Sequence, residues 1–424
     1  MALQWVARKY RKRRDKLSRK KAKIVRQLLA KGAAADPAGP RLRLYSFLLS
    51  RLAPSFRALP LSDYTSMSQE IGQVADSCEY VSETPRRMDD TPLCHNGAMP
   101  VIMARRFSQA WVTGTSSAIA TRTTIAIPAP YIGNRQALIT DSAFLLSQEN
   151  GVGIVHCPDP QPIAKGIVVF GSGAFNWYHW LIEILPAAFL AEKLPAKYAR
   201  FPLLVPEPCG AAGTFMDSVA LFAGDRPQIV MPAGAMYQVE QLVMIDPVVN
   251  GPMNMRAGYW PRVTDYSQSG DVLLNYRAAI LDRLGLAPER PSRRVFLARS
   301  NDRRSFNQAD LIAIAERQGF EAVYPERMTF REQVKMYAEA DILLGASGAA
   351  FANMLFCQPG AQGLTWLLPQ YDGFCAYSNL ARVAGVTLNY LFVTPQSKIN
   401  SSFDAYSAAY SLDPSDFEAA LRRF

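Results

Sequence analysis

The sequence predicts an α/β protein in which two domains face each other across a cleft, behind a basic N-terminal arm. From residue 166 onward, short apolar segments alternate with helical segments, a pattern typical of a parallel sheet with helices on both faces. A length of 424 residues is enough for two or three domains with substantial cores. The charge is concentrated at the start of the chain, so the arm separates from a nearly neutral body.

The arm comprises residues 1–33, which hold 13 of the 46 Lys and Arg residues and a single acid, Asp15. The remaining chain has 33 basic and 35 acidic residues. Because no Gly or Pro precedes Gly32, we expect the arm to be helical. Three interpretations remain open: a solvated tail, attachment to anionic lipid, or nucleic-acid binding. The body shows no second basic patch that would support nucleic-acid recognition.

Location is predicted from three further features. The chain has no run of 18 apolar residues that would form a membrane span, and no apolar segment follows the basic start as in a signal peptide. Six cysteines are scattered without a C-x-x-C pair, which favours reduced thiols over a disulfide frame or a zinc site. We therefore expect a cytoplasmic protein, held peripherally at the inner face of the membrane by residues 1–33.

The elements follow in order. Residues 34–41 have the composition of a linker, and residues 42–165 show an irregular pattern with short strands at 123–127 and 137–141. From there we expect strands at 166–170, 201–205, 228–231 and 241–245, and a helix at 215–222. After Pro261 the alternation becomes regular. We expect helices at 271–284, 308–318, 330–340, from about 348 to 356, 375–384 and 413–424, and strands at 294–298, 321–324, 341–345, 364–368 and 387–392.

The segment from Phe175 to Pro186 is the strongest indication of function. It places His179 and Glu183 four residues apart in an apolar, aromatic run, so that on a helix both side chains share one face and can pair. The run follows a buried-strand pattern and the turn sequence Gly171-Ser172-Gly173. Two interpretations fit this spacing: a core histidine whose hydrogen bond Glu183 satisfies, or an acid–base pair at the floor of an active site.

Ligands of such sheets bind beyond the carboxyl ends of the strands. Arg299, Arg303 and Arg304 follow the strand at 294–298 and precede Asn307, and such a cluster suits a phosphate or diphosphate or is simply a solvated loop. Residues 345–350, Gly-Ala-Ser-Gly-Ala-Ala, connect a strand directly to a helix. This turn suits an anion or serves close strand–helix packing.

The sequence contains no D-x-D, H-E-x-x-H or G-x-S-x-G motif, which reduces the case for a metal-dependent nucleotide-sugar site and for a serine hydrolase. A diphosphate site opposite a His/Glu pair suits group transfer. Arginines and a helix N-terminus would stabilise the departing nucleoside diphosphate, while His179 or Glu183 removes a proton from the acceptor hydroxyl.

Four motifs resemble glycosyltransferase family 61, of the capsular-polysaccharide-biosynthesis type, across residues 166–392. Residues 176–186 are similar to its N-Y-x-H-W-x-x-E-x-x-P signature. Three further segments are similar to other regions of the family. Ala298-Arg299 with Arg304 and Asn307 is similar to S-R-x-x-x-x-x-R-x-x-N. Residues 324–333, with Thr329 for Ser, are similar to P-E-x-x-S-F-x-E-Q, and residues 345–356 are similar to G-x-H-G-A-x-L-x-N-M-L-F. Ala298 stands for the serine of the S-R-x-x-x-x-x-R-x-x-N region. Two further departures matter for the chemistry: Ser347 stands for the family histidine and Thr365 for its glutamate.

The resemblance implies a GT-B-like pair of Rossmann-type domains and a metal-independent, inverting sugar transfer from a nucleotide-sugar donor to a polysaccharide or glycan acceptor, without a cofactor. The expected divisions are an arm and linker at 1–41, an acceptor-side domain at 42–265, a donor-binding domain at 266–396 and a helical tail at 397–424. His179 is the expected catalytic base and Glu183 orients it. The expected donor-binding residues are Arg299, Arg304, Asn307, Glu326, Ser347, Gly348 and Asn353.

Two other hypotheses remain. A catalytically inactive member of the same fold would act as a partner in a polysaccharide-assembly complex, and the substitution of the family histidine by Ser347 is compatible with it. A nucleic-acid-binding protein would depend mainly on residues 1–33. The first predicts no binding of nucleotide sugars, and the second predicts loss of RNA or DNA retention when the arm is removed.

Overall fold

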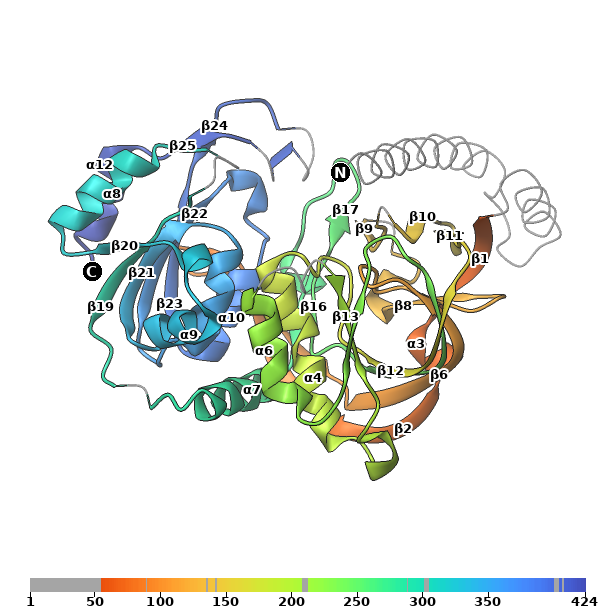
Figure 1. Ribbon diagram of the computed structural model, residues 1–424. Coiled ribbons are helices and arrows are strands. Elements are labelled where there is room, and N and C mark those ends of the chain that lie inside the picture. The colour runs from red at the N-terminus through yellow and green to blue at the C-terminus, as the bar shows by residue number, and fades with distance from the viewer. Residues whose placement is uncertain are drawn as a thin grey trace, which may run out of the picture.

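The computed structural model describes residues 55–88, 90–134, 136–141, 143–207, 213–287, 289–300, 305–399, 404–405 and 408–424. The predicted basic arm at 1–33 and the linker at 34–41 lie outside these residues, as do Arg303 and Arg304. Two sheets form the body, and the helices α4 (Pro186–Leu190), α6 (Gly213–Ala223) and α7 (Gly270–Arg283) lie between them (Figure 1). The protein is therefore a mixed α/β structure, as predicted.

The larger sheet has eleven strands in the order β10-β11-β1-β8-β7-β6-β15-β12-β13-β14, with β2 paired to β6. Its strands β15, β12, β13 and β14 are mutually parallel, whereas β6 runs antiparallel to β15. The strands are β1 (Phe56–Asp63), β2 (Gln69–Ala75), β6 (Ile102–Val112), β7 (Ile119–Ala120), β8 (Ile125–Ile127), β10 (Leu145–Glu149), β11 (Val152–His156), β12 (Gln161–Val168), β13 (Leu203–Pro206), β14 (Gln228–Met231) and β15 (Tyr237–Ile245).

The parallel part of this sheet is the part that strand–helix alternation predicts from residue 166. The predicted strand at 228–231 is confirmed residue for residue, and that at 241–245 is the second half of β15. The remaining strands of this sheet come from residues 56–156, where the sequence shows no alternation; their pairings are antiparallel except for that of β1 with β8, which is parallel. The sheet is therefore larger and more mixed than the sequence pattern suggests.

The smaller sheet is wholly parallel, in the order β20-β19-β21-β22-β23-β4. Its strands and helices confirm the regular alternation after Pro261 within two residues at each end, apart from the closing helix. The strands are β19 (Arg293–Leu297), β20 (Glu321–Val323), β21 (Ala340–Ala346), β22 (Gln362–Leu367), β23 (Thr387–Phe392) and β4 (Arg86–Arg87), and the helices are α8 (Gln308–Arg317), α9 (Phe330–Ala338), α10 (Ala376–Ala384) and α12 (Pro414–Leu421).

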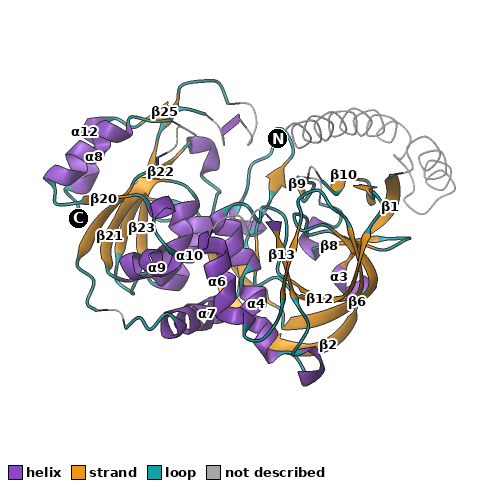
Figure 2. Ribbon diagram, viewed as in Figure 1, coloured by secondary structure: helices purple, strands orange, loops and turns teal. Residues whose placement is uncertain are grey.

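Helices cover both faces of the smaller sheet (Figure 2). Val295, Leu297 and Leu343 pack with α9 and α10 on one face. Phe296 and Leu344, the alternate residues of the same strands, pack with α8 and α12 on the other. This two-sided burial explains why these strands are continuous apolar runs.

Local signals set the helix ends. Thr329 caps α9 by accepting the N–H of Glu332, whose side chain bonds back to the Thr329 backbone in a capping box. Asp413 caps α12 ahead of Pro414. The predicted helix from about 348 to 356 is present but is of another type: it is a 3-10 helix, η7 (Ala349–Phe356), rather than an α-helix.

A hairpin from the N-terminal half crosses to the smaller sheet. Its strands are β3 (Cys78–Glu83) and β5 (Cys94–Met99), and β4 between them pairs with β23. The expected division at residue 265 stays a prediction, but β4 adds Arg86 and Arg87 of the N-terminal half to the C-terminal sheet, and β3 bonds to α10 through Asn379. One apolar cluster runs through both halves, from Val74 and Ile102 to Leu343 and Tyr377.

Candidate active site

The predicted strand–turn–helix unit at 166–186 is present, and its turn is held from both sides. β12 ends at Val168, and the chain turns at Gly171-Ser172-Gly173. Ser117 and Ser172 fix this turn reciprocally, since the backbone N–H of each donates to the hydroxyl of the other at 3.1 and 2.9 Å. Gly173 has a φ of +77°, and a Cβ there would lie 2.7 Å from Cδ2 of His179. A glycine is therefore required where the backbone passes the imidazole.

The helix that follows is a π-helix, η2 (His179–Ile184), rather than the α-helix expected from the spacing. Its wider turn is visible in the bond from Leu185 N–H to the carbonyl of Trp180, five residues back. The indole of Trp180 is fully buried and donates to Ser218 at 2.9 Å. Single π-turns are rare in proteins, but many of those that occur lie at functional sites. This one carries both predicted catalytic side chains.

His179 and Glu183 pair directly, as predicted. Nδ1 of His179 lies 2.7 Å from Oε2 of Glu183, and the side chains are 24% and 19% exposed. Because an ionised carboxylate only accepts, Nδ1 carries a proton and Nε2 is left to accept one. Burial lowers the pKa of His179, but the charge of Glu183 and its hydrogen bond raise the pKa by more, so that it lies above its ordinary value.

The pair opens into a cleft of about 480 Å³ between the two halves of the protein. The N-terminal half contributes residues of the turn, of η2 and of the segment 249–266, and the C-terminal half contributes Ser347 with residues of the segment 366–377. The structure thus brings His179, Glu183 and Ser347, three of the predicted site residues, to one cavity. Residues 168 positions apart in the sequence meet there because the carboxyl ends of β12 and β21 face the same cleft.

A guanidinium lies beneath the Ser347 turn. Nη2 of Arg299 donates to the carbonyls of Ala346 and Ser347 at 3.0 and 2.5 Å, and a Cβ at Gly348 would collide with this nitrogen. Leu297, Gly345 and Thr365 are aligned across β19, β21 and β22, so the turn and Arg299 occupy the carboxyl edge of the sheet. Arg299 positions the turn and adds positive charge behind it.

Three other predicted donor residues have partners away from the described lining of the cleft. Asn307 holds both backbone groups of Leu412, at 2.9 and 3.1 Å. Glu326 accepts the N–H and hydroxyl of Ser300 at 2.8 and 2.6 Å; burial raises its pKa, but these bonds lower it by more. Asn353 is fully buried. Arg304, the remaining predicted donor residue, lies outside the described residues.

Asn353 links the two halves instead. It accepts the indole N–H of Trp177 at 3.0 Å and donates to Gln333 at 2.8 Å, and Gln333 in turn donates to the carbonyls of Pro325 and Met328. Both ends of the amide are therefore occupied, and this geometry gives Asn353 a structural role. The motif residues around 177, 333 and 353 form one hydrogen-bonded connection between η2, α9 and η7.

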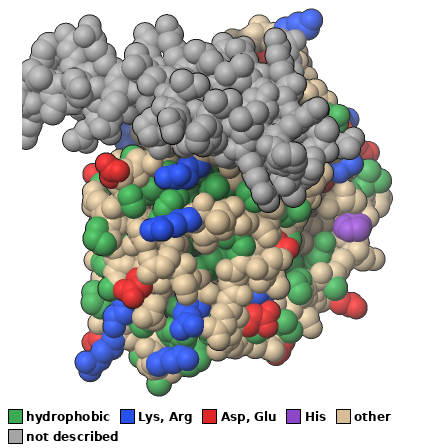
Figure 3. All heavy atoms as spheres, turned by 90° about the vertical axis from the view of Figure 1, so that its right-hand side faces the viewer, with side chains coloured by type: hydrophobic (Ala, Val, Ile, Leu, Met, Phe, Trp, Pro, Cys, Tyr) green, Lys and Arg blue, Asp and Glu red, His purple; other side chains and the backbone are tan. Residues whose placement is uncertain are grey.

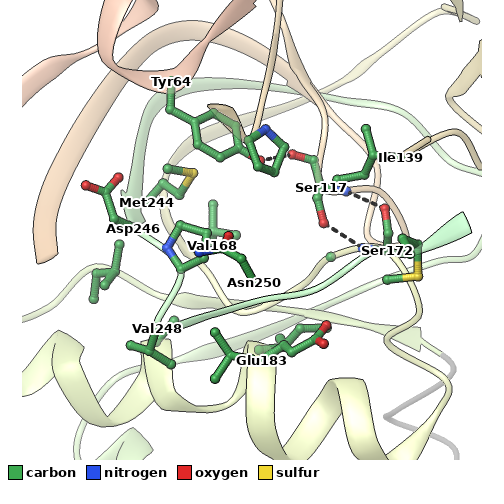
Figure 4. Close-up of a pocket in the computed structure, with 18 of the residues that line it drawn as sticks. Tyr64, Ser117, Ile139, Val168, Ser172, Glu183, Met244, Asp246, Val248 and Asn250 are labelled. Atoms are coloured by element: carbon green, nitrogen blue, oxygen red, sulfur yellow. Dashed lines mark hydrogen bonds between the residues drawn. The ribbon is translucent and has the colours of Figure 1, made fainter. Parts of the chain in front are cut away.

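Glu183 also lies in the wall of a second cavity, of about 110 Å³, within the N-terminal half. Figure 4 shows Glu183 on one side of it and Tyr64 and Ser117 on the other, with the Ser117–Ser172 bonds at its edge. Its remaining lining is mostly apolar. Glu183 therefore lies between two hollow spaces, since it lines both this cavity and the cleft.

Sequence reasoning missed most of the aromatic lining of the cleft. Tyr371 and Phe374 come from the connection between β22 and α10, where the chain shows no periodic signal, and Tyr377 comes from the first turn of α10. Phe175 directly precedes the first motif and is not among the predicted site residues, although it is 66% exposed. A large aromatic side chain left exposed beside a predicted catalytic residue is the signal that could have identified it.

Comparison with known proteins gives one family match. The family model of Glycosyltransferase 61 matches residues 177–364. This range begins at Trp177, includes β19 and β21, and ends in the first half of β22. No curated protein sequence matches the chain. The match includes η2 with its His/Glu pair, Arg299 and the Ser347 turn. The match supports the resemblance of the four motifs to glycosyltransferase family 61 and indicates that the protein is a glycosyltransferase.

Proposed function

We propose that this enzyme transfers a sugar from a nucleotide-sugar donor to a polysaccharide or glycan acceptor, of the capsular type, with inversion and without a metal ion. The observation that carries this proposal is the shared cleft of His179, Glu183 and Ser347. It joins a proton acceptor from one half to an anion-binding turn from the other. A GT-B-like pair of domains is part of the proposal, and the doubly covered parallel sheet supports it.

The proposed reaction is a single displacement. Nε2 of His179 takes the proton of an acceptor hydroxyl as that oxygen attacks the anomeric carbon of the donor. The bond between this carbon and the diphosphate oxygen breaks, and the nucleoside diphosphate leaves with the electron pair. Glu183 stabilises the imidazolium that forms, and backbone N–H groups near Ser347, with Arg299 behind them, offset charge on the leaving group.

Calorimetry with UDP-, GDP- and CMP-sugars, followed by product analysis, tests the donor assignment. We expect at least one donor to bind and its sugar to be transferred in the presence of EDTA with inverted anomeric configuration. Failure of every donor to bind would favour the inactive-partner hypothesis for this member of the family, and loss of activity in EDTA would remove metal independence.

His179→Ala should reduce kcat by roughly 10²–10⁴-fold, the usual contribution of a general base. His95→Ala is the matched control, because His95 lies on the β3–β5 hairpin away from the cleft. Full activity of His179→Ala would remove His179 as the base.

We also propose that residues 1–33 attach the enzyme to anionic lipid at the inner face of the cell membrane. Among the described residues, no helix combines the length and apolar character that crossing a bilayer requires. On the face in Figure 3, basic and acidic side chains are scattered together rather than gathered into a basic stripe, so nucleic-acid binding has less support. Removal of residues 1–33 should abolish sedimentation with vesicles of anionic phospholipid, while neutral vesicles should retain neither form.

A further inference from the structure

The cleft has an unusual lining for a site that receives a charged donor. Eight of its 24 described lining residues are aromatic, and Glu183 is the one carboxylate among them; this set contains no Lys or Arg. Pockets that recognise neutral ligands have this character, with apolar and aromatic walls and a few placed polar groups. The positive charge of Arg299 lies behind the Ser347 turn, on the side of the C-terminal half.

Phe175 extends this aromatic lining on the side of His179. It is 66% exposed, although its neighbours Ala174 and Tyr178 are buried. Its exposure does not come from an unrestrained loop, since Ala174 and Asn176 donate to the carbonyls of Gly171 and Gly173 at 3.3 and 2.7 Å. The side chain of Asn176 then accepts the N–H of Tyr178 at 2.9 Å. The turn therefore presents the phenyl ring four residues before the catalytic imidazole.

We propose that Phe175 is the stacking platform of the acceptor site and that the acceptor is an uncharged glycan. The inference rests on the proposed transfer reaction. A pyranose ring has an apolar C–H face that packs on an aromatic ring, and its hydroxyls remain free for polar contacts. Phe175 belongs to the same turn and helix as His179, so a ring stacked there directs a hydroxyl toward Nε2. An acidic acceptor would instead meet Glu183 with no cation in the described lining to balance it.

The alternative occupant of this platform is the nucleobase of the donor. The expected diphosphate site at Ser347 and Arg299 belongs to the C-terminal half, which carries its own aromatic residues, Tyr371 and Phe374, in the same cleft. A base that follows this diphosphate has those rings available. Phe175 is therefore assigned to the acceptor rather than to the donor.

Binding of the full-length protein to an array of neutral and uronic-acid-containing oligosaccharides tests the proposal. We expect the wild-type protein to retain neutral glycans, Phe175→Ala to lose roughly tenfold or more in affinity, and Phe175→Trp to keep it. Leu93→Ala is the matched control, because Leu93 is 71% exposed but is not part of the cleft lining. Preference for acidic glycans, unchanged binding by Phe175→Ala, or no glycan binding by the wild-type protein would overturn the proposal.

Donor turnover separates this inference from the proposed function. Hydrolysis of the donor without acceptor, in which water takes the sugar and the nucleoside diphosphate leaves, should be equally fast in the wild type and Phe175→Ala. With acceptor present, the acceptor KM of Phe175→Ala should rise. Impaired donor binding in Phe175→Ala would assign the ring to the nucleobase and overturn the acceptor platform. Glycan binding through Phe175 without any donor turnover would instead refute the transfer reaction and leave the platform in place.

Discussion

At the scale of the residue, Glu183 determines the charge state of His179. Burial alone would lower the pKa of the imidazole, but the carboxylate 2.7 Å from Nδ1 raises it. A general base accepts a proton only in its neutral form. For His179 as the proposed base, the pairing moves the pH at which the imidazole is neutral upward and stabilises the imidazolium that proton transfer would form.

Replacement of Glu183 by Gln should lower the pKa of His179. The acid limb of the kcat/KM profile should then move to lower pH, because the neutral imidazole persists further into the acid range. The plateau above this limb should fall, since Gln does not stabilise the imidazolium as a carboxylate does. Initial rates across the pH range measure both effects. Glu240→Gln, at an exposed position, is the control, and a Glu183→Gln profile that coincides with the wild type would contradict the assignment.

The same pair makes stability depend on pH in a defined direction. The pKa of His179 is higher in the folded protein than in the unfolded chain, so the pair contributes fully below the unfolded value of about 6.5. The contribution is lost as the pH rises through the folded pKa. The difference in unfolding free energy between wild type and Glu183→Gln, measured in urea, should be largest between about pH 5 and pH 6. A difference that grew with pH would have the wrong sign.

Gly173→Ala should impair catalysis and stability together. The change forces an alanine to a φ of +77° and places its Cβ against Cδ2 of His179, so the imidazole must shift from its position beside Glu183. Gly319→Ala is a matched control, because Gly319 has a φ of +78° and a Cβ added there would meet no heavy atom within 4 Å. Both should lose roughly 1–2 kcal/mol of unfolding free energy from backbone strain. Loss of kcat beyond the control is expected for Gly173 alone.

At the scale of the element, η2 is held against the C-terminal half by buried amides. Trp177, Asn353 and Gln333 form a continuous chain of hydrogen bonds, and the ring of Trp177 packs edge-on against Phe215 and Phe330 at centroid distances of 4.9 and 5.8 Å. Tyr178 adds a bond to the carbonyl of Ala376 at 3.4 Å. These contacts fix the helix that carries His179 relative to the wall that carries Ser347.

Asn353→Ala should cost about 2–3 kcal/mol of unfolding free energy, because it leaves the indole N–H of Trp177 and the amide oxygen of Gln333 unpaired. Urea denaturation measures the change, and Gln73→Ala, which removes an exposed bond to Asp76, should cost less than about 0.5 kcal/mol. An Asn353→Ala variant of wild-type stability that lost donor binding would return Asn353 to the donor site.

At the scale of the whole molecule, the two halves are joined by the β3–β5 hairpin as well as by the shared core. Asn379 of α10 is 2% exposed; it accepts the N–H of Glu83 at 2.8 Å and donates to the hydroxyl of Ser82 at 3.1 Å. Arg382 adds an exposed ion pair with Glu83 at 3.0 Å. The hairpin and the C-terminal sheet therefore share buried polar contacts that persist only while both halves are folded.

Asn379→Ala should weaken this contact, since it removes the hydrogen bonds that Asn379 makes with the N–H of Glu83 and the hydroxyl of Ser82. We expect a lower urea midpoint and a broadened or biphasic transition as the halves begin to unfold separately. Arg382→Ala removes an exposed contact between the same two elements and should change the unfolding free energy by less than about 1 kcal/mol. A single sharp transition at the wild-type midpoint for Asn379→Ala would show that the shared core alone couples the halves.

What could be predicted depends on local patterns in the sequence, and what could not depends on partners distant in the chain. Strands such as β23 and helices such as α10 are predictable to within a residue because their apolar periodicity and their caps are local. The pairing of His179 with Glu183 is local too, since four residues bring them together even on the wider π-helix. The antiparallel strands between residues 56 and 156 could not be placed, because their register depends on partners distant in the chain.

The alternating elements of the C-terminal half and the pairing of His179 with Glu183 are predictable from the sequence, because both depend on the spacing of residues along the chain. Which of the predicted residues share the cleft depends on the packing of the two halves. Ser347 meets His179 there, whereas Asn307 and Asn353 turn their amides to Leu412 and Trp177. The physical reason is that an amide or a serine carries the same polar groups wherever it lies, and its role depends on which buried partners the packing of the two halves brings within hydrogen-bond distance.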